Sequence, residues 1–135
     1  MIKFGKFTIS DKNKPFIIAE AGINHEGDMD KALELIDIAS DSGVSAVKFQ
    51  THITDKEMIP TDMTPGNISK EKLWDIIDRC VLTESQEKEL LEYSKEKKLF
   101  FFSTPFSREG ADRLNDLGVE IFKIGSGECN NLPLL

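Results

Sequence analysis

Leu99-Phe100-Phe101-Phe102-Ser103-Thr104 is the stretch that best indicates the fold, because four consecutive apolar residues are followed at once by polar ones. An uninterrupted apolar run of this length is typical of a strand buried on both faces, as in a parallel sheet covered by helices. Similar runs occupy residues 16–19, 46–49 and 121–124. We therefore expect four parallel strands, at about residues 16–20, 46–50, 99–104 and 121–125.

Helical patterns separate these runs. Apolar residues recur with the i, i+3, i+4, i+7 spacing of a helix in two intervals, at Ala32, Leu35, Ile36 and Ala39 and at Leu73, Ile76, Ile77 and Cys80. A further helix is expected to begin at Thr83, since Gln86 completes a capping box, and Ser107 is expected to cap another. Gly43 and Gly118 stand where helices are expected to end.

Strands that alternate with helices are typical of a parallel α/β protein. Two architectures fit the pattern, an open doubly wound sheet and a (β/α)₈ barrel. A complete barrel requires about 250 residues, so these 135 residues would form its N-terminal half, and we expect the end at residues 130–135 to be a truncation. A single partial domain over residues 1–135 would be preceded by a small β-hairpin at residues 2–9, turning at Gly5-Lys6.

Composition argues against several classes of protein. The chain has 17 basic and 24 acidic residues and a formal net charge of −7, whereas binding to nucleic acid requires clustered Lys and Arg. No apolar run approaches the roughly 20 residues that span a bilayer. Cys80 and Cys129 are too far apart for a CxxC unit. We expect a cytoplasmic protein without nucleic-acid or membrane partners, in which the charged residues 84–98 form a solvated helix face.

Polar side chains follow each expected strand, at the end where parallel α/β folds bind ligands. Lys48 and Lys123 are the most informative, because each interrupts an apolar strand and a buried ammonium requires either an anion or a lowered pKa. Alternation along the strand places Gln50 on the same side as Lys48. Thr104 and Ser126 would add hydroxyl groups. Such a set suits a ligand that carries both phosphate and carboxylate.

Two carboxylates, Glu20 and Glu128, stand at the same expected strand ends and are candidates for general acid–base catalysis. The alternative is that they neutralise the two lysines in an internal salt-bridge network. His25 and His52, the only histidines, also follow strands. Because two ligands are too few for a convincing metal site, we favour loop or substrate contacts for both.

Four stretches of the sequence resemble the N-terminal part of the sialic acid synthases. They are Ile18-Ala19-Glu20-Ala21-Gly22-Ile23-Asn24-His25-Glu26-Gly27, Val47-Lys48-Phe49-Gln50-Thr51-His52, Ser103-Thr104-Pro105-Phe106-Ser107-Arg108 and Phe122-Lys123-Ile124-Gly125-Ser126-Gly127-Glu128-Cys129-Asn130-Asn131. The resemblance runs over essentially the whole chain and favours the barrel over the open sheet. It implies an enzyme that condenses phosphoenolpyruvate with an N-acetylated amino sugar such as N-acetylmannosamine, releasing a nonulosonic acid and phosphate.

The resemblance also implies roles for individual residues. Lys48, Thr104, Lys123 and Ser126 would hold the phosphate and carboxylate, Gln50 and Glu20 would contact the sugar, and Glu128 would handle the protons of water addition. Glu20 and Glu128 are thus the expected catalytic residues. The divalent metal of the family, manganese or magnesium, would find its histidine ligands outside this chain. An antifreeze-like domain that completes a homodimer would also lie outside it.

Several alternatives stay open. Phe49 stands where neuraminate-forming relatives often carry His, which leaves the legionaminate, pseudaminate and spore-coat-polysaccharide branches possible. The chain alone would have a phosphoenolpyruvate half-site without turnover, or it would be a non-catalytic remnant or interaction module. Another condensing enzyme of the same fold is the third alternative, and Gly125-Ser126-Gly127-Glu128 and Asn24-His25-Glu26-Gly27 speak against it.

Overall fold

Three parallel strands form the centre of the structure, which is a computed structural model describing residues 1–4 and 7–135. They are β3 (Ile18–Gly22), β4 (Ala46–Thr51) and β5 (Phe100–Pro105). Strands that are neighbours in the sheet are neighbours in the chain, with β4 in the middle. A doubly wound sheet reverses its strand order at one point, and no reversal occurs among the described strands, as in the wall of a barrel.

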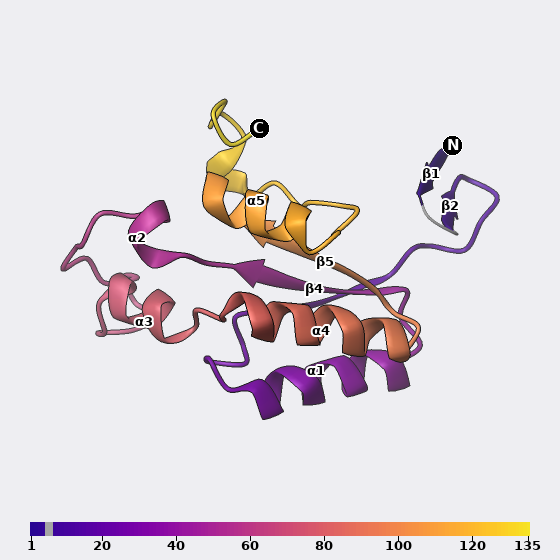
Figure 1. The fold of residues 1–135 in the computed structure, drawn as a ribbon, viewed down its shortest axis with the longest axis horizontal. Coiled ribbons are helices and arrows are strands. Elements are labelled where there is room, and N and C mark those ends of the chain that lie inside the picture. Colours follow the sequence, from indigo (N-terminus) through magenta and orange to yellow (C-terminus); the bar gives the residue numbers. More distant parts are fainter. Residues whose placement is uncertain (5–6) are drawn as a thin grey trace.

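Helices run along these strands. Helix α1 (Met29–Asp41) and helix α4 (Glu84–Glu96) lie side by side and contact the strands, and α5 (Arg108–Asp116) packs on β5 (Figure 1). The long connection between β4 and α4 contains two short helices, α2 (Thr54–Glu57) and α3 (Leu73–Arg79). All the predicted helical intervals are confirmed, whereas α2 was not predicted.

The helix ends follow local sequence signals. The Thr83 hydroxyl accepts the N–H of Gln86, and Gln86 Oε1 accepts the N–H of Thr83 at 2.8 Å, so the predicted capping box is formed. Ser107 caps α5 by accepting a backbone N–H at 3.0 Å. Gly43 and Gly118 follow α1 and α5 with φ of 69° and 77°. Glycine adopts this left-handed backbone without the penalty that a Cβ brings.

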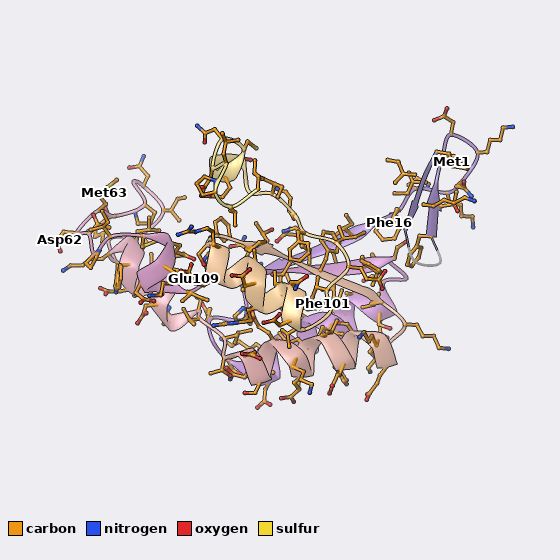
Figure 2. All side chains as sticks on the ribbon, turned by 45° about the horizontal axis from the view of Figure 1, so that its top comes forward. Met1, Phe16, Asp62, Met63, Phe101 and Glu109 are labelled. Carbon is orange, nitrogen blue, oxygen red and sulfur yellow. The ribbon has the colours of Figure 1, made fainter. Side chains whose placement is uncertain are left out.

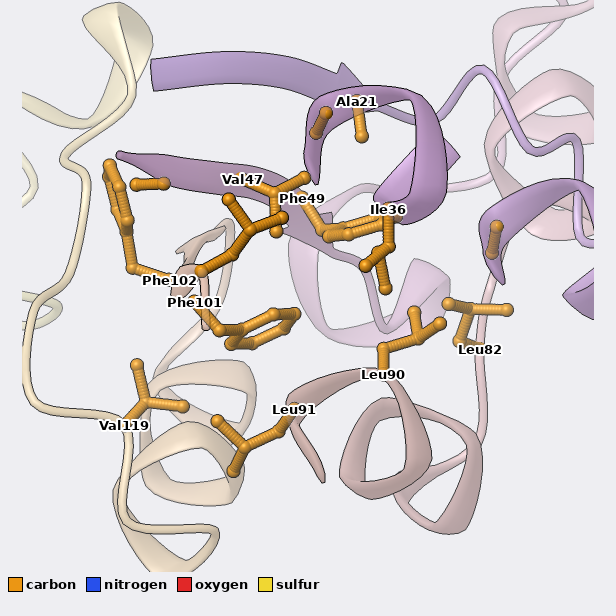
Figure 3. Packing of buried hydrophobic residues seen from close by; sticks show 14 of the residues in the cluster. Ala21, Ile36, Val47, Phe49, Leu82, Leu90, Leu91, Phe101, Phe102 and Val119 are labelled. Carbon is orange, nitrogen blue, oxygen red and sulfur yellow. The ribbon is translucent and has the colours of Figure 1, made fainter. Parts of the chain in front are cut away.

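The hydrophobic core lies between the strands and the helices. Figure 3 shows Phe101 of β5 above Leu91 of α4, with Val47 and Ile36 close by. The residues of β4 alternate, so that buried Val47 and Phe49 join this core while Lys48 and Gln50 belong to the opposite face. The polar face of β4 is thus left for a site.

The prediction of a fourth strand at residues 121–125 is wrong. Only one parallel bridge forms there, between Ser103 and Phe122, and the N–H of Lys123 donates to the Ser103 carbonyl at 3.0 Å. The segment follows β5 only briefly, because the chain turns at Gly125 into the 3₁₀ helix η1 (Ser126–Glu128). The first expected strand lies two residues further along than predicted, a normal uncertainty for a strand boundary.

The predicted hairpin is confirmed as β1 (Ile2–Phe4) paired antiparallel with β2 (Phe7–Ile9). Its expected turn at Gly5-Lys6 lies outside the described residues. Phe7 packs edge-on against Phe16 and Phe100, with ring centroids 4.9 and 5.8 Å apart. The hairpin therefore lies near the start of β5.

The connection that carries α2 and α3 extends in the opposite direction. Figure 2 shows Met1 at one end of the molecule and Asp62 and Met63 at the other. None of the described helices has the length and apolar character needed to cross a membrane.

Candidate active site

A hollow of about 430 Å³ lies at the carboxyl ends of the three strands. We call it the strand-end hollow. Six of the seven predicted site residues line it, namely Glu20, Lys48, Gln50, Thr104, Lys123 and Ser126. They come from β3, β4, β5 and the segment after residue 121, so the parallel arrangement gathers side chains that are far apart in the sequence.

Lys48 is a buried cation that lines the strand-end hollow. Only 9% of the residue is exposed, as predicted for a lysine within a buried strand. Its ammonium forms an ion pair with Glu20, its register partner on β3, and donates to the Thr104 hydroxyl at 3.3 Å. The internal salt-bridge alternative therefore holds for this lysine. The Glu20 side chain is 52% exposed, so a ligand anion has access to the pair from solvent.

Lys123 differs from Lys48, and the expectation that it is buried is wrong. The residue is exposed, because its segment does not form a full strand that neighbours could enclose. Its ammonium donates to the carbonyl of Ile124. Among the described residues, no carboxylate lies within 4.0 Å of it. The strand-end hollow thus contains one cation paired with a carboxylate and one that is open to an anion.

Glu128 lies next to the strand-end hollow without lining it, since a Cβ built on Gly125, a lining residue, would be 3.5 Å from Glu128 Cγ. It belongs to η1, is absent from the lining of the strand-end hollow, and accepts a hydrogen bond from Asn131 Nδ2 at 2.6 Å. The internal salt-bridge alternative therefore does not hold for Glu128, which forms no ion pair with Lys123. Ser126, two residues earlier, does line the hollow.

A second group of polar side chains contacts Gln50 from outside the strand-end hollow. His52 Nε2 is 3.0 Å from Gln50 Oε1, and His52 Nδ1 is 2.8 Å from Glu57 Oε1. The ring stacks on Phe106 with centroids 4.6 Å apart and planes 8° apart. His52 was expected to contact a loop or the substrate, and the loop contact is seen, because Glu57 belongs to the connection between β4 and α4. No sequence signal connects Glu57 with this site.

His25 is fully buried next to the same strand ends. Its Nδ1 accepts the N–H of Gly27 at 3.0 Å. Burial lowers the pKa of His25, and the nearby charge of His52 lowers it further. The lowered pKa favours the neutral ring, and because Nδ1 accepts the N–H of Gly27, the proton of that neutral form is on Nε2.

The described residues do not fit a metal ion. No three His, Cys, Asp or Glu side chains among them gather closely enough to form a ligand set. His52 already uses both ring nitrogens.

Glu87 corrects the expectation of a solvated face over residues 84–98. This α4 residue is 4% exposed, and its Oε2 accepts from Arg113 of α5 at 3.3 Å. Burial raises the pKa of Glu87, while a hydrogen bond from Thr51 and the Arg113 charge act in the opposite direction. Thr51 also hydrogen-bonds Ser103 at 2.8 Å. These contacts tie the ends of β4 and β5 to the helices beneath them.

Phe49 lies in the hydrophobic core. It is 2% exposed and stacks on Phe101 with centroids 5.8 Å apart, so it belongs to the core rather than to the strand-end hollow.

The fold and the site together define the class of protein. The chain forms part of a (β/α)₈ barrel that carries a lysine-containing site at its strand ends. The chain belongs to the NeuB family, whose model matches residues 35–135.

Individual relatives agree with this assignment. The chain is 42% identical over 127 residues to the N,N'-diacetyllegionaminic acid synthase of Campylobacter jejuni, covering 90% of this chain and 38% of the relative. It is 40% identical to the spore coat polysaccharide biosynthesis protein SpsE of Bacillus subtilis, covering 95% of this chain and 35% of that protein.

A solved sialic acid synthetase from Leptospira borgpetersenii, in complex with citrate, superposes with a TM-score of 0.82 at 34% identity. The match covers 98% of this chain and 44% of that one. The chain thus spans less than half the length of each of these relatives.

Proposed function

We propose that this chain forms the phosphoenolpyruvate-binding part of a synthase that joins phosphoenolpyruvate to an N-acetylated amino sugar. The products are a nonulosonic acid and inorganic phosphate. The observation that carries the proposal is the pair of lysines, Lys48 and Lys123, on one small hollow with two hydroxyl groups. Phosphoenolpyruvate carries a phosphate and a carboxylate on the same carbon atom, and two ammonium groups with hydroxyl donors match that charge pattern.

Binding requires an exchange of partners at Lys48. In the free chain Glu20 neutralises this ammonium. An entering phosphate or carboxylate takes over the contact, with Thr104 beside it, and Lys123 holds the second anionic group. The Glu20 carboxylate is then free to turn toward the second substrate.

Glu20 and Gln50 are the groups that we assign to the sugar. A Cβ built on Gly22 would lie 3.3 Å from Glu20 Oε1 and 3.5 Å from Gln50 Nε2, so both groups flank Gly22 on the same side. Gly22 also has a φ of 56°, which a residue with a side chain adopts only with strain. A bare backbone at this position leaves room for a sugar next to the carboxylate and the amide.

The proposed reaction forms one carbon–carbon bond and breaks the bond between the enol carbon and the phosphate. The methylene carbon of phosphoenolpyruvate forms a bond to the aldehyde carbon of the open-chain sugar, and the aldehyde oxygen gains a proton to become a hydroxyl. Water adds to the former enol carbon, and the tetrahedral intermediate loses phosphate to leave a keto acid. We assign the proton transfers to Glu20 and, for the addition of water, to Glu128. Glu128 would have to release Asn131 to act in this way.

The proposal also covers the metal ion, the oligomeric state and the cellular location of the complete enzyme. A divalent cation, manganese or magnesium, would be held by ligands outside these residues. The complete enzyme would be a homodimer and would work in the cytoplasm. Residues 1–135 alone would bind phosphoenolpyruvate without turning it over.

The proposal is tested by measuring phosphate release from the complete gene product with phosphoenolpyruvate and a panel of N-acetylated hexosamines. We expect release only when both substrates are present, with one keto acid formed for each phosphate. Absence of release with the whole panel, or release that does not depend on the sugar, would contradict the proposal. Formation of a nonulosonic acid by residues 1–135 alone would refute the half-site model.

A further inference from the structure

We propose that Glu57 and His52 act as a positioning pair that holds the side-chain amide of Gln50 on the sugar side of the strand-end hollow. That the ligand on this side is a sugar rests on the proposed function. That Gln50 is held in place rests on its contact with His52 and on the contact of His52 with Glu57. Neither His52 nor Glu57 lines the hollow. Both therefore act through Gln50, which does.

The three side chains form a continuous chain of contacts. Gln50 belongs to β4, His52 follows the strand, and Glu57 is the last residue of α2. The ring of His52 is within hydrogen-bond distance of both neighbours, at 3.0 Å from Gln50 Oε1 and 2.8 Å from Glu57 Oε1. Glu57 Oε2 also accepts the N–H of Ile53 at 3.3 Å. The carboxylate is thus held through both oxygens.

Burial and stacking restrict the ring further. The side chains of His52 and Glu57 are only 4% and 5% exposed. The ring lies flat against Phe106, itself a lining residue of the hollow. The ring faces an oxygen atom on each side, Glu57 Oε1 and Gln50 Oε1, and both accept, so the ring donates from Nδ1 to the carboxylate and from Nε2 to the amide oxygen. A ring fixed in this way offers the amide one hydrogen-bonding position.

A consequence for the hollow follows directly. Because the ring holds the oxygen of the Gln50 amide, the amide nitrogen is directed toward the space beside Gly22, which Glu20 Oε1 also borders. An unsupported glutamine side chain samples several rotamers and loses that freedom when a ligand binds. The positioning pair fixes the Gln50 side chain before the sugar binds, so less conformational entropy is lost on binding. It also orients the amide for a polar group of the sugar.

The test uses two variants and a matched control in the complete gene product. Glu57→Gln keeps the size of the side chain but removes its charge, and His52→Phe keeps the stacking on Phe106 but removes both nitrogens. Lys56→Gln is the control, because Lys56 is an exposed neighbour on the same short helix whose ammonium pairs with exposed Asp55 at 3.1 Å. The KM for each substrate is measured separately.

We expect the KM for the amino sugar to rise about 10- to 100-fold in both variants, the range typical of losing a supporting contact. The KM for phosphoenolpyruvate should change by less than about twofold, and the control should match the parent protein. In a Gln50→Ala background, Glu57→Gln should have no further effect on the KM for the sugar. An equal rise in both KM values, or an effect that persists in that background, would overturn the proposal.

A second readout does not depend on activity. Selective ¹⁵N labelling of glutamine makes the Gln50 amide visible by NMR, and its signal is assigned by its loss in Gln50→Ala. We expect this signal to shift in Glu57→Gln and in His52→Phe but not in Lys56→Gln. If no sugar supports turnover while the signal shifts, the proposed function fails and the positioning pair stands. An unchanged signal in both variants would overturn the positioning pair.

Discussion

Lys48 of β4 forms an ion pair with Glu20, the residue directly opposite it on β3, and the two partners differ sharply in burial. The lysine side chain is 11% exposed and the glutamate side chain 52%. The cation is thus fixed in the sheet, while its anion faces solvent and is exchangeable. Such a pair compensates the buried ammonium and, under the proposed function, would exchange Glu20 for an anionic group of the ligand.

Replacement of Glu20 by Gln tests this exchange. The variant leaves Lys48 without its carboxylate, so we expect a lower melting temperature in the absence of ligand. Inorganic phosphate or phosphoenolpyruvate should raise the melting temperature of Glu20→Gln more than that of the parent protein, because no internal anion competes. Thermal unfolding over a series of ligand concentrations measures both effects. An equal ligand-induced shift in the two proteins would show that Glu20 does not compete for the site.

Replacement of Lys123 by Gln separates binding from stability. Lys123 is exposed and has no carboxylate partner among the described residues, so we expect the free energy of unfolding to change by less than about 0.5 kcal/mol. The KM for phosphoenolpyruvate should rise about tenfold or more, since a charge-assisted contact is lost. Lys88→Gln, on the exposed face of α4, is the control for the change in net charge. A similar KM in the two variants would remove Lys123 from the site.

Gly27 is predicted to tolerate substitution far less well than Gly43. Both have positive φ, at 82° and 69°, but a Cβ on Gly27 would lie 2.1 Å from the carbonyl oxygen of Arg79, whereas one on Gly43 meets nothing within 4 Å. Gly43→Ala should therefore cost only about 1–2 kcal/mol of backbone strain. Gly27→Ala should cost clearly more, because the loop after β3 must move away from the end of α3. Urea unfolding of the two variants measures the difference, and equal costs would contradict the packing.

Protonation of His25 is expected to destabilise the fold. Burial lowers the pKa of His25 below its ordinary value of 6.5, so the unfolded chain binds more protons than the folded chain as the pH falls below that value. The stabilising contribution of the neutral ring is fully present above about pH 6.5 and is lost as the pH falls through the folded-state pKa.

His25→Asn removes this titration and keeps an acceptor for the N–H of Gly27. Between about pH 7.5 and 5.5, the parent protein should lose more unfolding free energy than the variant. Urea unfolding at several pH values provides the measurement. Parallel pH profiles for the two proteins would show that His25 titrates equally in both states.

Local patterns in the sequence were sufficient to predict most of the secondary structure. The capping box at Thr83 and the cap at Ser107 depend on contacts three residues apart, which the sequence alone displays. Strand alternation likewise predicted that Lys48 and Gln50 share a face. The segment at residues 121–125 was predicted wrongly, because its apolar pattern is that of a strand while strand formation requires neighbours that local sequence does not show.

The sequence by itself determined which side chains stand at the strand ends and which family the chain resembles, since both are properties of order and spacing along the chain. Tertiary structure alone decided that Lys48 is enclosed while Lys123 is open, that Glu87 turns inward, and that Glu57 reaches His52. Lys48 and Thr104 are 56 residues apart and yet in contact. Burial and partner choice are set by distances between remote segments, and those distances exist only after the strands and helices have packed together.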